Sequence, residues 1–320
     1  MAERDLIDRV NETVDAIIAR DDATIALRDP ELAPLARVAA DLRHYVSPDF
    51  KARLRTTLER RTSMTTMTTP TAVREGFTTV TPYIRVPDPG LIEFLTQVFD
   101  AQETFSAAGG GGGMHREVRI GDSMLMIGEG SDAGGIMRIR PMAFHVFVQD
   151  VDAAYARAVA AGATALGEPA DRHYGERAGF VRDPFGNHWY IATPLGPQSL
   201  ASSQRAVTPV LHAKGAGEYM DFLTRALGAV EEIRAPGPSD EVRYARMRVG
   251  DAAIELGEAD SMPGSFMLYV TDPDSLYQQA IAAGCRSIMP LSDQPYGRVG
   301  GVEDPIGNQW FFSRPATPPA

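Results

Sequence analysis

The sequence predicts an α+β fold in which a βαβββ pattern occurs four times, after an N-terminal stretch that is helical throughout. The first observation is a repeated stretch, which begins at Asp183 and again at Asp304, 121 residues further on. The second is that strand-like alternation and single helical stretches follow one another in the same order in four segments. The third is the length of 320 residues, which fits two domains and a shorter additional segment.

Each copy of the repeat reads Asp-Pro-x-Gly-Asn and leads into an alternating strand. Proline presets φ for a turn, and glycine accepts a backbone conformation that other residues resist. An aspartate before such a proline normally bonds the backbone of its own turn, so Asp183 and Asp304 are predicted to be structural. In the strand after each turn, Trp189 and Trp310 have the parity that we expect to pack beneath the helices.

Residues 1–62 predict three short helices that form an N-terminal arm. Apolar residues recur at three- and four-residue spacing from Leu6 to Ile18, and Asp29-Pro30-Glu31 and Ser47-Pro48-Asp49 are helix start signals. Two interpretations stay open: a small bundle packed on the main body, or an arm that binds a protein partner or a second copy of the chain. Residues 63–75 are rich in threonine and lack periodicity, which indicates a linker.

The rest of the chain predicts two tandem domains, at residues 76–194 and 206–314, each with two βαβββ modules. Their helices correspond, because one ends Ala160-Ala161-Gly162 and another ends Ala282-Ala283-Gly284, with the glycine as C-cap in both. A run of glycines at 109–113 interrupts the first module. No Gly-Lys-Ser/Thr follows it, so a flexible hairpin loop is predicted instead of a phosphate-binding loop.

Composition excludes several classes of function. The formal net charge of −11 argues against a nucleic-acid partner. Cys285 is the single cysteine, so neither an intrachain disulfide nor a cysteine-rich metal site can form, which fits the reducing cytoplasm. The charged N-terminus and the absence of a long apolar run predict neither secretion nor a membrane partner.

Several short motifs resemble the vicinal oxygen chelate superfamily, which includes glyoxalase I, extradiol dioxygenases and bleomycin resistance proteins. They are Val98–Glu103 after the first helix, Val148–Asp152 before the second, and the two Asp-Pro-x-Gly-Asn turns. The string from Tyr174 to Tyr190 looks most like the PhnB-like branch. The resemblance covers residues 76–314 and implies that paired modules curl into two open, mixed-sheet cups.

The resemblance also implies a divalent metal, held by histidine and glutamate side chains on the cup-facing strand positions. The corresponding positions on the first strands are Thr81, Ala143 and Ser265, and those on the last strands are Met126, Tyr190, Glu255 and Phe311. Only Glu255 is a carboxylate there, whereas a catalytic metal needs about three protein ligands. We therefore predict no cofactor, although a metal at relocated ligands stays an alternative.

Period-two alternation identifies the cup-facing side chains. The ligand-binding candidates are Tyr83, Arg85, Met126, His145, Phe147, His188, Tyr190, Tyr269, Gln309 and Phe311. Aromatic, thioether and imidazole groups suit a planar ligand with one or two polar handles. We expect Tyr83 and Arg85 to share the cup of the first domain with His145 and its neighbours. His212 and Glu255, expected in the cup of the second domain, are the candidate acid–base pair.

The predicted function is metal-independent binding of a planar or aromatic small molecule, either to sequester it or to handle it in metabolism. One alternative is a lyase or isomerase of glyoxalase type that uses a relocated metal or the histidine–glutamate pair. Another is a ligand-sensing module whose helical arm engages a protein partner. A homodimer is also left open. Tyr174 and Tyr296, in loops near the cup mouths, are candidate gates or merely turn residues.

Overall fold

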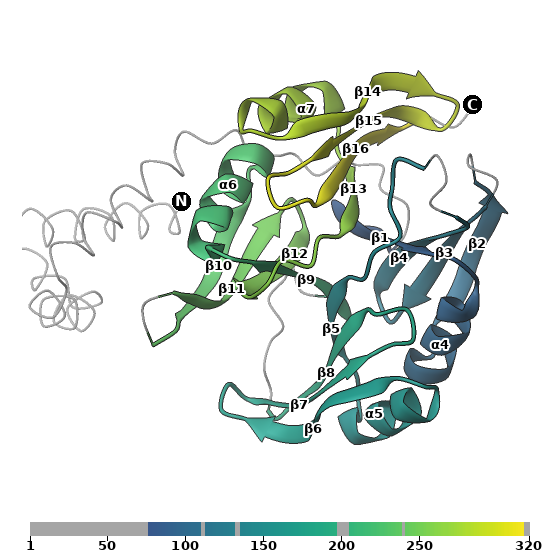
Figure 1. The fold of residues 1–320 in the computed structure, drawn as a ribbon, viewed down its shortest axis with the longest axis vertical. Helices are drawn as coiled ribbons and strands as arrows, with labels where there is room; N and C mark the ends of the chain where they lie inside the picture. Colours follow the sequence, from purple (N-terminus) through teal and green to yellow (C-terminus); the bar gives the residue numbers. More distant parts are fainter. Residues whose placement is uncertain (1–75, 110–112, 132–134, 197–204, 239–240, 317–320) are drawn as a thin grey trace, which may run out of the picture. The chain divides into compact units, whose positions relative to one another are not determined.

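The computed structural model describes residues 76–109, 113–131, 135–196, 205–238 and 241–316. The predicted helical arm and linker lie outside these ranges. The described part consists of four βαβββ modules, as the sequence predicts (Figure 1).

The first two modules occupy the first half of the described chain. Module 1 contains β1 (Val80–Val86), α4 (Gly90–Phe99), β2 (Gln102–Ala108), β3 (Met114–Ile120) and β4 (Ser123–Glu129). Module 2 contains β5 (Ala143–Phe147), α5 (Val151–Ala160), β6 (Thr164–Arg172), β7 (Glu176–Arg182) and β8 (His188–Pro194).

The last two modules repeat this order. Module 3 contains β9 (Val207–Ala213), α6 (Ala216–Leu227), β10 (Val230–Pro236), β11 (Val242–Val249) and β12 (Ala252–Glu258). Module 4 contains β13 (Ser265–Tyr269), α7 (Pro273–Ala282), β14 (Arg286–Gln294), β15 (Gly297–Glu303) and β16 (Gln309–Pro315).

Local sequence explains where the helices begin and end. Asp150 and Asp272 are N-caps, whose carboxylates accept backbone N–H bonds from Ala153 and Ser275. Helix α6 ends at Gly228, which adopts the left-handed conformation and lets the backbone close the last turn. The corresponding position after α4 is Asp100, the only non-glycine residue with positive φ in the described ranges.

The modules combine into two eight-stranded mixed sheets that join distant parts of the chain. The first sheet has the order β14-β15-β16-β13-β1-β4-β3-β2, and the second has the order β10-β11-β12-β9-β5-β8-β7-β6. In the first sheet β1 pairs antiparallel with β13, and in the second β5 pairs antiparallel with β9. The first sheet therefore joins modules 1 and 4, and the second joins modules 2 and 3.

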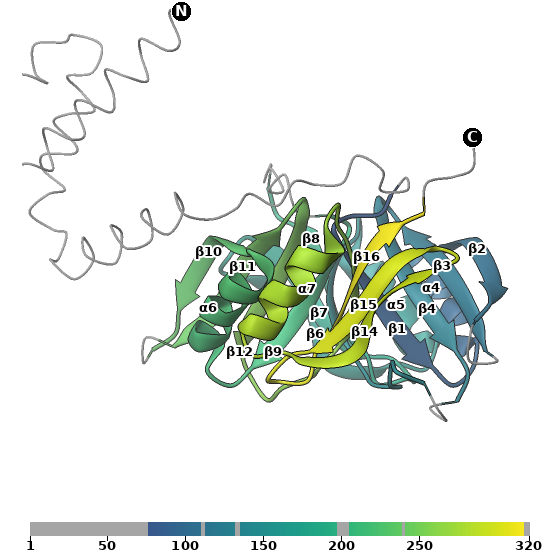
Figure 2. The same cartoon turned by 90° about the horizontal axis from the view of Figure 1, so that it is seen from above.

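This pairing corrects the expected grouping of cup residues. Tyr83 and Arg85 share a sheet with module 4, and His145 shares a sheet with module 3. The helices follow the chain order instead: Arg157 on α5 donates to the carbonyl of Val98 on α4, and Gln279 on α7 donates to that of Arg225 on α6. Figure 2 shows α6 beside α7. The two helices of each tandem half therefore contact each other, whereas each sheet contains strands from both halves.

One continuous hydrophobic core includes residues from every module, among them Leu95, Trp189, Leu223 and Trp310. Strand residues alternate between this helix-packed core and the opposite face, which we call the cup face of each sheet. The first cup is the cup face of the first sheet, and the second cup is that of the second sheet. The expected packing of both tryptophans is confirmed, since each is fully buried and stacked on a phenylalanine.

The repeated Asp-Pro turn is structural, as predicted. The carboxylate of Asp183 accepts bonds from the backbone N–H groups of Phe185 and Asn187 and from the indole of Trp189. The carboxylate of Asp304 accepts the equivalent indole bond and a further one from the Tyr219 hydroxyl at 2.6 Å. Both aspartates are buried and bonded on the core side, away from the cups.

Candidate functional site

The second cup is built around His145, whose ring lies between two carboxylates. Its Nδ1 is 3.0 Å from Oε2 of Glu255, and its Nε2 is 3.4 Å from Oε2 of Glu176. Both ring nitrogens therefore face carboxylate oxygens, which accept hydrogen bonds and favour the doubly protonated ring. His145 comes from module 2 and Glu255 from module 3, so this contact forms only because β5 and β9 pair.

The protonation state of His145 follows from these neighbours. Burial acts to lower the pKa of the imidazole, but the charges and hydrogen bonds of Glu255 and Glu176 outweigh it and raise that pKa to about 10. Tyr244 also hydrogen-bonds Glu255, and burial followed by the charge of Glu255 raises the pKa of this phenol. His145 is therefore an imidazolium at neutral pH, held among acceptors that keep it charged.

The predicted acid–base pair of His212 and Glu255 is not the pair that the structure brings together. Nε2 of His212 lies 3.1 Å from the hydroxyl of Tyr190, and Glu255 bonds His145. Burial and the neighbouring His188 lower the pKa of His212, so this imidazole is neutral at pH 7. Alternation correctly places all these side chains on cup faces but cannot give the partner of each.

Partly exposed rings surround the charged group of the second cup. The rings of Phe180 and Tyr190 meet edge to face at 5.2 Å, and the ring of Phe147 lies 4.3 Å from that of His145. The guanidinium of Arg172 lies 4.9 Å over the ring of Phe180. The second cup thus offers aromatic surface beside the guanidinium of Arg172 and the ion-paired ring of His145.

The first cup is lined mainly by apolar and aromatic side chains, but it also holds the buried carboxylate of Glu117, whose Oε1 lies 3.5 Å from Nε2 of His115. Phe77, Met124 and Met126 are buried there and pack with the partly exposed side chains of Tyr83, Met267 and Tyr269. The hydroxyl of Tyr83 lies 2.9 Å from Nδ1 of His115, and burial raises the pKa of this phenol to about 12. Tyr83 therefore stays neutral and can act as a hydrogen-bonding group.

Two further predicted ligand residues belong to the floor of the first cup. Phe311 is 3% exposed and Gln309 is 1% exposed. The amide of Gln309 accepts a bond from Ser265 and donates one to the carbonyl of Ile136. These groups are already satisfied, so they shape the floor while Tyr83, Arg85 and Tyr269 stay partly accessible.

Three residues close to these sites were not in the sequence-based set. Glu176 and Tyr244 contact the His145 cluster, and His115 contacts Tyr83. All three lie on the third strand of their modules. Glu176 belongs to the Tyr174–Tyr190 string that carries the family resemblance, and this string is the one sequence signal for its position. Nothing in the spacing of His115 or Tyr244 indicates their partners.

Tyr174, between β6 and β7, and Tyr296, between β14 and β15, are the two loop tyrosines expected near the cups. Tyr174 is 51% exposed and Tyr296 is 64% exposed. Burial and then the charge of Glu176 raise the pKa of Tyr174, and Tyr296 contributes to the raised pKa of Tyr83. Tyr174 therefore accompanies the second cup and Tyr296 the first.

The residues at the family's metal positions do not fit a divalent metal. The side chains of Thr81, Ala143, Ser265, Met126 and Phe311 offer no imidazole or carboxylate, and Tyr190 is bonded to His212. Glu255 is the one carboxylate among these positions, and it is hydrogen-bonded to the ring of His145. Across the described ranges, no group of three histidine, cysteine, aspartate or glutamate side chains is placed to hold a metal ion.

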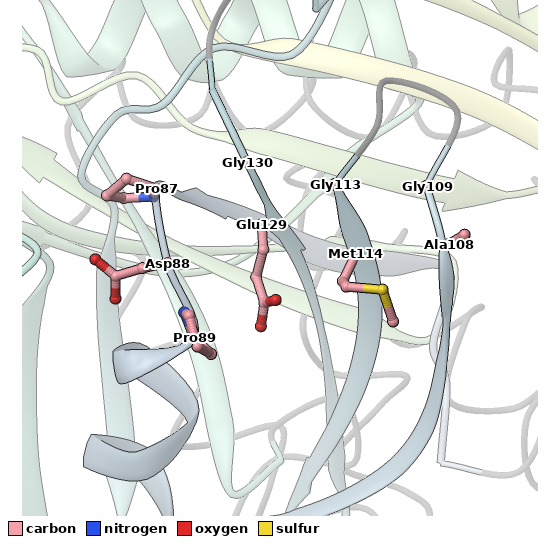
Figure 3. A pocket seen from close by; sticks show the side chains of 9 residues that line it. All are labelled: Pro87, Asp88, Pro89, Ala108, Gly109, Gly113, Met114, Glu129 and Gly130. Atoms are coloured by element: carbon pink, nitrogen blue, oxygen red, sulfur yellow. The ribbon is translucent and has the colours of Figure 1, made fainter.

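A separate hollow of about 400 Å³ lies at the N-terminal end of α4 (Figure 3). Its lining residues are Pro87, Asp88, Pro89, Ala108, Gly109, Gly113, Met114, Glu129 and Gly130. Glu129 is ion-paired with Arg116 at 2.6 Å. None of the predicted site residues lines this hollow.

Paired βαβββ modules that build two open mixed sheets define a class of proteins, and the sequence matches one family within it. The match covers residues 82–191 and 210–312 and is to the Glyoxalase/Bleomycin resistance protein/Dioxygenase superfamily. The chain belongs to this superfamily, which confirms the resemblance.

Individual relatives agree with the family assignment. An uncharacterized protein of Mycobacterium bovis is 32% identical over 126 residues, which cover 34% of this chain and 83% of that protein. An uncharacterized protein of Mycobacterium tuberculosis is also 32% identical over 126 residues, covering 34% of this chain and 74% of its own length.

Among solved structures, glyoxalase I from Zea mays is similar with a TM-score of 0.58 and 14% sequence identity. The match covers 73% of this chain and 92% of that enzyme, and it shows the shared fold alone. In the part of the chain that the structure describes, no helix has the length and apolar character that a membrane span requires.

Proposed function

We propose that this protein binds a planar or aromatic small molecule at the second cup without the help of a metal ion. The observation that carries the proposal is the set of partly exposed rings around the imidazolium of His145. Aromatic rings contribute contact area and edge-to-face contacts to a planar ligand, and the guanidinium of Arg172 adds a cation beside them.

The state of His145 also supports metal independence. A metal ligand must present an unprotonated nitrogen, and both ring nitrogens of His145 lie beside glutamate carboxylates, which favour the protonated ring. Glu255, the only carboxylate at a family metal position, is engaged by that cation. A metal would have to displace a buried ion pair before it could bind here.

The test is thermal stabilisation by a panel of planar aromatic compounds, followed by calorimetry on those that raise the melting temperature. Tyr190→Leu removes a ring of the second cup and should weaken binding at least about tenfold, an effect typical of a lost aromatic contact. Tyr155→Phe is the matched control, because the Tyr155 hydroxyl has no bonding partner and the residue lies on helix α5. Equal loss in both variants, or no binding by any compound, contradicts the proposal.

Metal dependence has its own test. Elemental analysis of the purified protein should find no stoichiometric divalent metal, and EDTA should leave ligand affinity unchanged. A bound metal whose removal abolishes ligand binding contradicts metal independence but not the location of the site.

The second candidate function is a lyase or isomerase of glyoxalase type, and the contact of His145 with Glu255 is the observation that favours it. In this alternative, His145 and Glu255 form the acid–base pair in place of the predicted pair of His212 and Glu255. Turnover in a glyoxalase I assay that is lost in both His145→Gln and Glu255→Gln, with folding retained, supports an acid–base pair. Binding without turnover supports the first proposal.

A further inference from the structure

Arg85 lies on the cup face of the first sheet in a site shaped to receive it. It follows Tyr83 on the same face of β1, and it pairs with Gly128 on β4. A β-carbon at position 128 would lie 2.7 Å from Nη1 of Arg85 and 2.8 Å from the ring of Tyr83. The absence of a side chain at Gly128 therefore lets both side chains lie across the sheet.

The guanidinium of Arg85 has weak partners for a group with five donors. Nη1 donates to the carbonyl of Glu129 at 3.4 Å, and Nη2 donates to the carbonyl of Ser131 at 3.3 Å. Its Nε is buried and has no hydrogen-bond partner. Within the described ranges, no carboxylate lies within ion-pair distance of Arg85, although Arg116 and Arg246 on the third strands of their modules both contact one.

A partly buried cation without a counter-charge is costly, and the geometry of guanidinium matches planar or tetrahedral oxyanions. The surface beside Arg85 is apolar and aromatic. Tyr83 and Tyr269 are partly exposed beside Met126, and the exposed Tyr296 is close enough to influence Tyr83. A ligand here could place a ring against these side chains and an anionic group against Arg85.

We propose that the first cup binds an aromatic oxyanion, a planar ring that bears a carboxylate or a phosphate, with Arg85 holding the anionic group. This inference extends the proposed function, the binding of planar small molecules, to a second site with a stated ligand charge. The two cups then differ in chemistry. In the second cup two glutamates already neutralise the His145 cation, whereas in the first cup Glu117 contacts His115 and the ligand supplies the anion for Arg85.

The experiment compares 1-naphthoate, 1-naphthyl phosphate and the neutral 1-naphthamide by calorimetry on the full chain. At least one of the two anions should bind about tenfold or more tightly than the amide, as expected for a charge-assisted pair. Which anion is favoured separates a carboxylate from a phosphate. The NMR signals of the His115 ring should shift on binding, because His115 bonds Tyr83 in this cup.

Three variants test whether Arg85 causes the preference for an anionic ligand. Arg85→Gln should remove the preference for the anion, and Arg85→Lys should keep part of it because the charge remains without the fork geometry. Arg314→Gln is the control, since it removes the same charge from an exposed position on the core-side face of the same sheet. Melting temperatures of the three variants verify folding.

The outcomes separate this inference from the proposed function. Equal affinity for anion and amide, or an anion preference unchanged in Arg85→Gln and Arg85→Lys, overturns the role of Arg85. If all binding is lost in Tyr190→Leu and none in Arg85→Gln, the ligand lies in the second cup; the proposed function then stands and this inference falls. Binding of none of the three probes overturns this inference, while the panel test at Tyr190 decides the other.

Discussion

At the scale of single residues, the charge of His145 organises the second cup. A histidine usually titrates near neutral pH, but this one is held between Glu176 and Glu255 on opposite edges of its ring. The arrangement keeps the imidazole protonated at neutral pH, so His145 could serve as an acid but not as a general base. Tyr190 and His212, which bond each other beside it, remain neutral.

Glu255→Gln tests this description through stability. The folded-state pKa of His145 is raised from 6.5 to about 10, so its contribution is fully present below pH 6.5 and is lost as pH rises toward 10. Losing one partner of a buried pair should cost about 3 kcal/mol at pH 7 and should flatten the decline in stability between pH 7 and 10. Urea unfolding at several pH values measures both effects.

Glu168→Gln is the control, because Glu168 is exposed. Nitrogen chemical shifts of the histidine rings give a direct check, since His145 should remain doubly protonated at pH 8. A His145 signal that titrates near 6.5 contradicts the charged description, whatever the stability data show.

At the scale of elements, helix ends show how far local sequence rules reach. The C-cap glycine of α6 and the aspartate N-caps of α5 and α7 follow standard sequence signals. Helix α4 departs from them, because Asp100 adopts φ of 55° where α6 has Gly228 at 66°. Asp is among the residues that tolerate this conformation, but glycine does so without a steric cost.

Substitutions at these two cap positions should therefore change the free energy of unfolding in opposite directions. Gly228→Ala should lower the free energy of unfolding by about 1 kcal/mol, and Asp100→Gly should raise it by about 0.5 kcal/mol because relief of strain exceeds the added unfolded-state entropy. Gly196→Ala, at a glycine with no atom within 4 Å of the added carbon, should change it little. Chemical denaturation provides all three values. Destabilisation by Asp100→Gly shows that the aspartate is not strained.

At the scale of the whole molecule, the sheets could not be predicted from the sequence. Alternation correctly assigned strand residues either to a cup face, as for Tyr190, or to the core, as for Trp189, because parity is local. Strand pairing between modules depends on contacts between residues far apart in the sequence, such as His145 with Thr208 and Thr81 with Met267. The first strands of the four modules have similar patterns, so local sequence does not show which of them pair. The grouping of Tyr83 with His145 therefore followed chain order, whereas the structure places them in different sheets.

Modules 1 and 3, which belong to different sheets, are joined by two sets of hydrogen bonds, and each module supplies the accepting carboxylate of one set. The carboxylate of Asp251 accepts bonds from the backbone N–H and the hydroxyl of Thr79, both at 2.7 Å. The carboxylate of Asp122 accepts the backbone N–H of Ala206 at 2.8 Å. Because each sheet also takes strands from both tandem halves, we expect residues 76–316 to unfold as one unit.

The two tryptophans test this cooperativity, since the chain has only Trp189 and Trp310 and they lie in different sheets. Fluorescence of the single-tryptophan variants Trp189→Phe and Trp310→Phe should each give one unfolding transition. Asp251→Ala, made in each of these backgrounds, should lower the melting temperature seen by both tryptophans by about 4–8 °C, the shift expected from about 2 kcal/mol in a domain of this size. Asp260→Ala, which removes an exposed surface ion pair with Lys214, should shift neither by more than about 2 °C. If Asp251→Ala moves one transition and leaves the other in place, the sheets unfold independently, and the shared strands do not make the molecule a single cooperative unit.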